Sequence, residues 1–267
     1  MHQKLATSPI TYVLAQVIFT NIESISDYIP RLQDKIRELF PHFQTMNSQI
    51  IPLINGQQVM PSSNIQWHFI DKNKHTGIIL DGRSITIHTS LYSNFEMLLD
   101  KFCQILKWGN EILKFGLITR TGLRYINFIA NDLDKIEQHI LGFKLNVDED
   151  KDTLVPDKFL TKTETVQLSH CGVIKIQATH ISDKASIAEI RNTFITPELI
   201  DGASMLSFEH YKEPEKDFLL LDIDHFNDHQ FEFDVEKIRN NFKQLQEVIY
   251  QVFCRAVGNN ILAYWSK

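Results

Sequence analysis

Runs of apolar residues divide the first part of the chain into a strand and a helix. Residues 12–19 read Y-V-L-A-Q-V-I-F, which is almost wholly apolar and rich in β-branched side chains, as in a strand buried on both faces. Residues 24–40 repeat apolar side chains at helical spacing, and Pro30 stands near the start, where a helix tolerates proline. A polar stretch at residues 44–63 is predicted to separate this unit from the strands that follow.

Short strands and a long helix are predicted next. An Asp-Gly dipeptide, typical of a tight hairpin turn, joins the last two strands. Ser93 and Glu96 have the spacing of a capping box, which predicts that a helix begins there, with one apolar stripe running to Leu113. The strands are expected at residues 65–70, 77–80 and 84–89.

The same order of elements begins again after Gly116. A long segment at residues 117–129 predicts a strand, and Asp234 has the chemistry of a helix cap. Residues 182–214 show little pattern apart from one short helix at 197–200. The other elements are expected to be a helix at 132–141, an acidic loop at 146–158, hairpin strands at 160–169 and 173–179, a strand at 218–223, a long helix after Asp234 and a last strand at 261–265.

Both halves therefore read as strand, helix, three strands and long helix, although their residues hardly repeat. We expect an α+β fold in which two pseudo-repeated units, residues 1–116 and 117–267, each curl a mostly antiparallel sheet around a long helix. Either unit alone would leave an apolar sheet face in water, so the two are expected to share a sheet through residues 117–129, as one pseudo-two-fold body. Two separate α+β domains are the alternative.

Composition and charge narrow the class of protein. The chain has 267 residues, of which 43% are hydrophobic and 22% charged, typical of a globular protein with a substantial core. Its net charge is −6, and no block of five like charges occurs. A broad phosphate-binding surface is usually basic, so nucleic acid is not an expected partner.

The cysteines and the N-terminus indicate a cellular compartment. Cys103, Cys171 and Cys254 are far apart and odd in number, and none belongs to a C-x-x-C pair, which argues against a zinc ribbon and a disulfide framework. The first residues lack the apolar core of a signal peptide, and no apolar run is long enough to span a membrane. We therefore expect a cytoplasmic protein that does not engage a membrane.

A cluster of acidic and histidine residues is the richest in chemistry. Asp222 and Asp224 alternate along a predicted strand and so share one face, and His225, Asp228 and His229 follow closely. Carboxylates and imidazoles can bind a divalent metal, but the spacing is not that of an EF-hand. A polar strand end before the next helix explains the same residues, so we expect no metal site and no cofactor.

Two arginines form the next candidate. Arg120 and Arg124 lie four residues apart on a predicted strand, hence on one face, with Gly122 between them. Two guanidinium groups can clamp a carboxylate or phosphate of a ligand or partner. The alternative, which we favour, is that they pair with acidic residues of a neighbouring strand, and Asp222 and Asp224 are the expected partners.

His88 completes the set of candidate binding residues. It alternates with Thr86 and Ser90 on one face of a predicted strand, and a Ser–His dyad is conceivable there. No G-x-S-x-G motif surrounds any serine, and the chain has no P-loop, no G-x-G-x-x-G and no H-E-x-x-H. A polar strand face is the preferred interpretation, so no catalytic residue is assigned.

Four segments carry a resemblance to a known family. They are P-I-x-Y-V-L-A-Q-V-x-F at residues 9–19, T-S-x-Y-x-x-F at 89–95, R-x-G-L-R-Y-I-N at 120–127 and L-L-D-I-D at 220–224. In this order the segments resemble those of an uncharacterised family of sporadically distributed bacterial proteins, over nearly the whole chain. The resemblance implies no established activity. The family's sporadic distribution implies mobile genes, such as phage-defence or toxin–antitoxin loci.

The absence of catalytic signatures favours a non-enzymatic binding protein. We expect it to act on another protein, for instance the product of an adjacent gene, and a homodimer is also compatible with the sequence. The candidate binding residues are Arg120, Arg124, Asp222, Asp224 and His88.

Two other functions remain open from the sequence. The first is a helix-grip module, in which a long helix closes a curved sheet over a small-ligand pocket with ligand-binding or hydrolase-like activity. A pocket lined by Arg120 or Arg124 would favour it, whereas a fully packed interface between sheet and helix would count against it. The second is nucleic-acid binding through a saddle-shaped sheet, which requires a basic concave face and conflicts with the net charge of −6.

Overall fold

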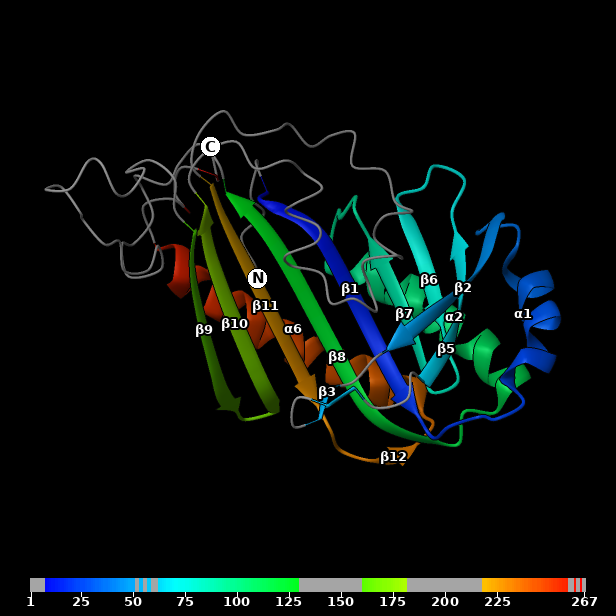
Figure 1. The fold of residues 1–267 in the computed structure, drawn as a ribbon. Coiled ribbons are helices and arrows are strands. Elements are labelled where there is room, and N and C mark those ends of the chain that lie inside the picture. Colours follow the sequence, from blue (N-terminus) through cyan, green and yellow to red (C-terminus); the bar gives the residue numbers. More distant parts are fainter. Residues whose placement is uncertain are drawn as a thin grey trace, which may run out of the picture.

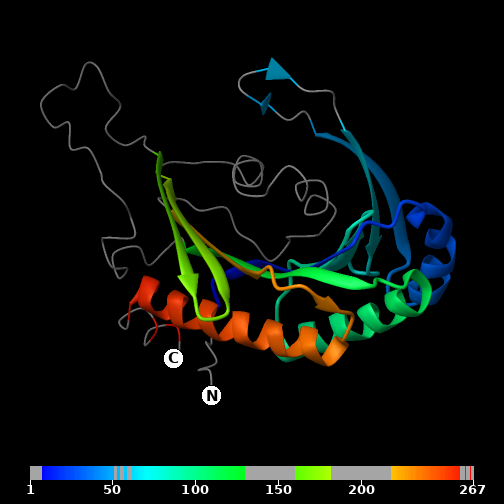
Figure 2. The same cartoon turned by 90° about the horizontal axis from the view of Figure 1, so that it is seen from below.

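A curved antiparallel sheet runs through the described part of the chain, with helices along one of its faces (Figure 1). In the computed structural model the described residues are 8–50, 53–54, 57–58, 62–129, 160–181, 218–258, 262 and 265. The prediction of an α+β protein with a mostly antiparallel sheet packed on long helices is confirmed. Figure 2 shows that the sheet bends away from helices α2 and α6 at both ends.

The sheet contains ten strands, all paired antiparallel. Their order is β2, β5, β6, β7, β1, β8, β11, β10 and β9, and β12 pairs with β8 beside this path. The bounds are β1 Ile10–Phe19, β2 His42–Ile50, β5 Ser62–Ile70, β6 Thr76–Leu80, β7 Ser84–Thr89, β8 Leu117–Ile129, β9 Leu160–Ser169, β10 Gly172–Ile181, β11 Phe218–Asn227 and β12 Phe231–Glu232. Strands β3 (Leu53–Ile54) and β4 (Gln57–Gln58) pair separately.

Strand β1 lies near the centre of the sheet and is buried on both faces, as its apolar sequence predicts. Val13 and Val17 are fully buried in the cluster under the helices. Tyr12 and Leu14 point the other way and are 2% and 6% exposed. The neighbours of β1 are β7 and β8, so strands from both halves of the chain meet along it.

The helices differ from the sequence prediction at the first one. Residues 24–40 were expected to form a single helix, but they form a short 3₁₀ turn, η1 (Ile25–Tyr28), followed by α1 (Ile29–Ile36). Pro30 explains the division, because a proline at the start of a helix lacks the N–H that would continue the preceding turn. The long helices α2 (Phe95–Leu113) and α6 (Val235–Val257) lie where their apolar stripes predict.

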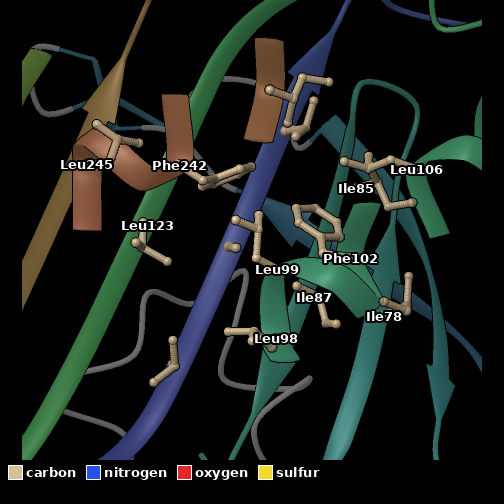
Figure 3. Close-up of a cluster of buried hydrophobic side chains, with 14 of the residues drawn as sticks. Ile78, Ile85, Ile87, Leu98, Leu99, Phe102, Leu106, Leu123, Phe242 and Leu245 are labelled. Atoms are coloured by element: carbon tan, nitrogen blue, oxygen red, sulfur yellow. The ribbon is translucent and has the colours of Figure 1, made fainter. Parts of the chain in front are cut away.

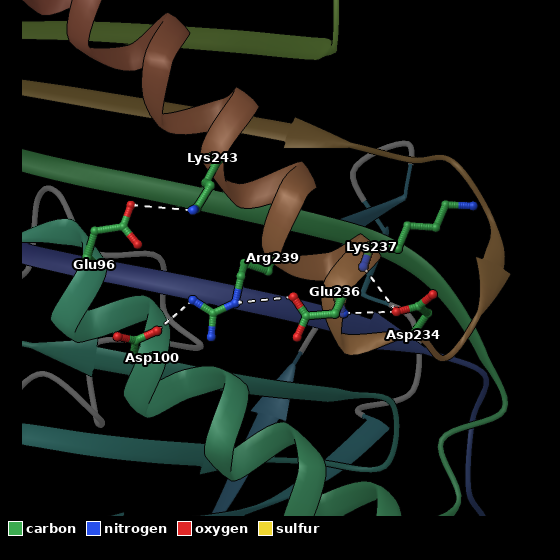
Figure 4. A network of polar contacts seen from close by, with 7 residues as sticks. All are labelled: Glu96, Asp100, Asp234, Glu236, Lys237, Arg239 and Lys243. Atoms are coloured by element: carbon green, nitrogen blue, oxygen red, sulfur yellow. Dashed lines mark hydrogen bonds and ion pairs between the residues drawn. The ribbon is translucent and has the colours of Figure 1, made fainter. Parts of the chain in front are cut away.

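Both long helices begin at a side-chain cap. Asp234 accepts hydrogen bonds from the backbone N–H groups of Glu236 at 2.9 Å and Lys237 at 3.1 Å, as predicted (Figure 4). The capping box at Ser93 is wrong, because the cap of α2 is Asn94, whose side chain accepts from the N–H of Met97 at 2.9 Å. Asn94 has the extended backbone that a capping residue requires.

Charged side chains join the first turns of α2 and α6 (Figure 4). Arg239 of α6 donates to Asp100 of α2 at 2.6 Å and lies 3.8 Å from Glu236 on its own helix. Lys243 and Glu96 form a second link between the helices at 3.7 Å. The carboxylates are exposed, so these pairs align the helices but contribute little stability each.

Apolar side chains fill the space between the helices and the sheet (Figure 3). Phe102 of α2 and Phe242 of α6 are fully buried, with ring centroids 5.8 Å apart. They pack over sheet residues such as Ile85, Ile87 and Leu123, which are also fully buried. The face of the sheet under the helices is therefore a packed core.

Two further sequence predictions are corrected. The polar stretch at 44–63 was expected to separate the first strand and helix from the strands that follow, yet its first residues belong to β2, which pairs with β5 along its length. A strand at the edge of a sheet needs no apolar run, because it has a neighbour on one side only. Leu262 and Trp265 are helical, not extended as expected for 261–265. The elements predicted at 132–141, 146–158 and 182–214 lie outside the described residues.

The cap of α6 gives a testable expectation. Asp234→Ala should lower the free energy of unfolding by about 1 kcal/mol, because two backbone N–H groups lose their acceptor. Urea denaturation followed by circular dichroism measures this. Asp34→Ala, an exposed aspartate away from any helix start, is the matched control, and equal midpoints for the two variants would contradict the role of the cap.

Candidate functional site

Strand register brings three of the predicted binding residues into one row. Leu14 of β1 is paired with His88 of β7 on one side and with Arg124 of β8 on the other. Arg124 is in turn paired with Asp224 of β11. Alternating side chains point to opposite faces of a strand, and Leu123 belongs to the core under the helices. His88, Arg124 and Asp224 therefore lie on the face of the sheet opposite α2 and α6. No helix of the described residues packs on this face, and we call it the helix-free face.

Arg124 forms a buried ion pair with Asp222 on this face. Its Nε donates to Oδ1 at 2.8 Å and its Nη2 to Oδ2 at 2.5 Å, so both carboxylate oxygens are engaged. The two side chains are only 11% and 6% exposed. A bidentate pair of this kind satisfies the groups that burial removes from water. Arg124 and Asp222 thus pair with each other across β8 and β11, in agreement with the interpretation of the sequence that we favoured.

Asp224 lies directly opposite Arg124 but is not its ion-pair partner. Burial raises the pKa of Asp224 to about 6, and Asp222 adds to the shift, whereas Arg124 opposes it. Among the described residues, no hydrogen-bond donor engages the Asp224 carboxylate. The two hydrogen bonds described above for the Arg124 guanidinium go to Asp222, and Lys175 of β10 lies opposite Asp224 on its other side, with its ammonium group 2.9 Å from Glu164.

Arg120 is separated from this pair. It was expected to share the carboxylates of Asp222 and Asp224, but it forms an ion pair with Asp228, just beyond the end of β11. Its guanidinium also lies 4.2 Å from the ring centroid of Phe226. The reason is register, because Arg120 is too far along β8 to face the two central aspartates. This pair is half exposed, unlike that of Arg124.

His88 is a buried neutral residue next to Tyr12. The phenol of Tyr12 and Nδ1 of His88 are 2.8 Å apart, and the imidazole is fully buried. Burial lowers the pKa of His88 to about 3, and nearby His68 adds to the shift. A Cβ added to Gly77 would come within 2.4 Å of the His88 Nε2, so glycine makes room for the ring. His88 therefore contributes a fixed polar group to the row and not a charge.

The acidic and histidine residues near Asp222 do not converge on one point. Asp222 is held by Arg124 and Asp228 by Arg120, while His225 lies on the opposite face of β11. Within the described residues, no group of three or more His, Cys, Asp or Glu side chains is arranged to hold a metal. Alternation along the strand explains the dispersal, because neighbours in sequence face opposite sides of the sheet.

The structure contains a Ser–His contact that the sequence analysis missed. Ser169, at the end of β9, lies 2.8 Å from Nε2 of His225, and Nδ1 of His225 lies 3.1 Å from the carbonyl oxygen of Leu245 in α6. A carbonyl only accepts, so Nδ1 carries the proton and Nε2 of the neutral ring is an acceptor. The donors within its reach are the Ser169 hydroxyl, which also lies 3.1 Å from the Gly172 carbonyl oxygen, and the Cys171 thiol at 3.9 Å. His225 therefore fastens the β9–β10 hairpin to α6. Its partners are distant in sequence, and no local motif signals them.

Comparison with known proteins does not assign the chain to a family. The chain matches no protein-family model, and it matches no curated protein. The fold and the site define an α+β protein with an open antiparallel sheet, helices packed on one face and a buried ion pair on the other. Among the described helices, none has the length and apolar character needed to cross a membrane.

The contrast between the two arginines is testable. Arg124→Ala should lower the free energy of unfolding by about 3–5 kcal/mol, because Asp222 stays buried without a counter-charge. Arg120→Ala removes an arginine from the same strand, but its ion pair is half exposed, so a loss of about 0–1 kcal/mol is expected. Urea denaturation of both variants separates them, and similar losses would show that burial does not govern the Arg124 pair.

The pKa of Asp224 predicts a pH dependence. Its folded pKa, about 6, lies above the ordinary value of 3.8, so the folded state binds more protons between these values and this group stabilises the fold as pH falls. Asp224→Asn removes the effect. The thermal midpoint of the variant, relative to wild type, should thus be higher at about pH 7.5 than at about pH 5. A difference that does not change with pH would contradict this.

Proposed function

We propose that this protein is a non-enzymatic, cytoplasmic binding protein that recognises another protein through the helix-free face of its sheet. The observation that carries the proposal is the Asp224 carboxylate. It is half-buried beside a guanidinium that Asp222 already occupies, and no described residue donates to it. Lys175 of β10 lies opposite Asp224, but its ammonium group contacts Glu164 at 2.9 Å, which leaves the Asp224 carboxylate to bind a cation supplied from outside the chain.

The charge of the site indicates the chemistry of the partner. The cations Arg120, Arg124 and Lys175 are paired with Asp228, Asp222 and Glu164, so these three pairs are neutral and an ionised Asp224 makes the group acidic by one charge. The whole chain carries a net charge of −6. Both favour a lysine or arginine side chain of a partner and steer a basic surface toward the sheet. The same balance argues against a nucleic-acid backbone as the ligand.

The helix-grip alternative receives less support. It needs a pocket between the sheet and a long helix, lined by Arg120 or Arg124. Arg124 instead lies on the other face of the sheet, and fully buried side chains such as Phe102 and Phe242 fill the interface with the helices. A packed interface of this kind counts against a ligand pocket at that position.

The pseudo-two-fold architecture belongs to this proposal. Strands β7, β6, β5 and β2 extend from β1, and strands β11, β10 and β9 extend from β8 in the opposite direction. This order supports two related units, 1–116 and 117–267, that meet at the β1–β8 pair. The resemblance to sporadically distributed bacterial proteins favours a mobile locus of the defence or toxin–antitoxin type, in which the partner is the product of an adjacent gene.

The experiment uses the products of the adjacent genes. Each is purified and titrated into wild-type protein, Asp224→Asn and Glu38→Gln in a calorimeter. Binding by one of them, weakened about tenfold or more in Asp224→Asn, is expected because a buried charge pair is lost. Glu38, on the surface beyond α1, is the charge-matched control and should leave the affinity unchanged. Absence of binding by every product, or equal affinity of all three proteins, would overturn the proposal.

A further inference from the structure

The edge of the sheet formed by β9 is open and long. Among the described strands β9 has one neighbour, β10. Residues 162–168 are exposed on both faces of the strand, and Val166 and Leu168 are 59% and 86% exposed. An edge strand presents unpaired backbone N–H and C=O groups and is a template for pairing with another strand.

The side chains of β9 are arranged symmetrically about Thr163. Lys162 and Glu164 flank it with opposite charges, and Thr161 and Thr165 flank these in turn. In a symmetric antiparallel pair, each residue lies opposite the one equally far on the other side of the centre. Pairing of two β9 strands about Thr163 therefore sets Lys162 of each copy opposite Glu164 of the other, and Thr161 opposite Thr165.

Charge selects this register over its neighbours. A pair centred on Lys162 would place two lysines opposite each other, and a pair centred on Glu164 would place two glutamates opposite each other. Like charges directly opposite are unfavourable, whereas opposite charges stabilise a cross-strand pair. Centring on Thr163 brings two ion pairs across the edge at once. We propose that two copies of this protein associate through β9, edge to edge, about a two-fold axis at Thr163.

The surroundings of these charges fit the pairing. Glu164 already contacts Lys175 of β10 at 2.9 Å, and both side chains are 42% exposed, so its carboxylate is held in place and still accessible. No ion pair joins Lys162 to another described residue. Lys162 of the second copy would thus complete Glu164 from the open side. A two-fold axis perpendicular to the sheet keeps both helix-free faces on the same side of one continuous sheet.

Charged residues on an edge strand can also prevent association, so the test must separate the two roles. Sedimentation equilibrium over a range of concentrations is expected to give a dimer for the wild type. Lys162→Glu and Glu164→Lys each turn two opposite-charge pairs into like-charge pairs and should raise the dimer dissociation constant about tenfold or more. An equimolar mixture of the two variants restores both pairs and should dimerise again, which a folding defect would not allow.

A matched control is Lys72→Glu, a charge reversal in the exposed turn between β5 and β6, which should leave the dimer unchanged. A wild type that is monomeric at every concentration overturns the proposal. So does a dimer that Lys162→Glu and Glu164→Lys do not weaken, or a mixture that stays monomeric. These outcomes are measured on the protein alone, without the partner that the Asp224 proposal requires, so a failure of one proposal is distinguishable from a failure of the other.

The register has its own test. Thr163→Cys places two thiols opposite each other on the axis, where paired Cα atoms about 4.5–5.5 Å apart suit a disulfide. Gln167→Cys, exposed on the same face of β9, would lie roughly 27 Å from its copy in this register. On a non-reducing gel, with wild type as the background for the native cysteines, only Thr163→Cys should give a covalent dimer. Cross-linking at Gln167 and not at Thr163 would overturn the proposed axis.

Discussion

The ion pair between Arg124 and Asp222 is the interaction on which the helix-free face depends. The central strands are buried on both faces, and only one of these faces is apolar throughout. A charge on the other face is tolerated only if it is paired and hydrogen-bonded, and the two bonds of Arg124 meet that requirement. The pair also joins β8 to β11, the strands that extend the sheet into its second half.

Alternation along the strands gives the two faces different roles. On β11, Ile223 points into the core under α6, while Asp222 and Asp224 point to the helix-free face. The helices thus provide most of the apolar burial, and the other face can carry polar groups without loss of the core. His88 and Tyr12 extend these polar groups across β1 to β7, where burial keeps the imidazole neutral. The charged side chains of this row, Arg124 and Asp224, therefore lie on β8 and β11 and not on β1 or β7.

Much of the fold follows from local patterns, because the long apolar stripes of α2 and α6 and the alternation in β8 can each be read within a short window. The sequence also predicted that Arg124 would meet an aspartate of β11. It did not separate Asp222 from Asp224, since that choice depends on a diagonal reach between strands whose register no local pattern specifies. Strand β2 and the Ser169–His225 contact were missed for the same reason, as both depend on partners distant in the chain.

The row of the candidate site continues to the open edge of the sheet. In the register of the strands, Asp224 of β11 lies opposite Lys175 of β10, and Lys175 lies opposite Val166 of β9. Lys175 contributes to holding down the pKa of Asp224, yet its ammonium group contacts Glu164. One lysine thus interacts with a carboxylate at the centre of the helix-free face and with another at the edge. A second cation beside Glu164 weakens the attraction between Glu164 and Lys175. The positive charge of Lys175 then interacts more strongly with Asp224. The edge and the centre of the sheet are therefore electrostatically connected through Lys175.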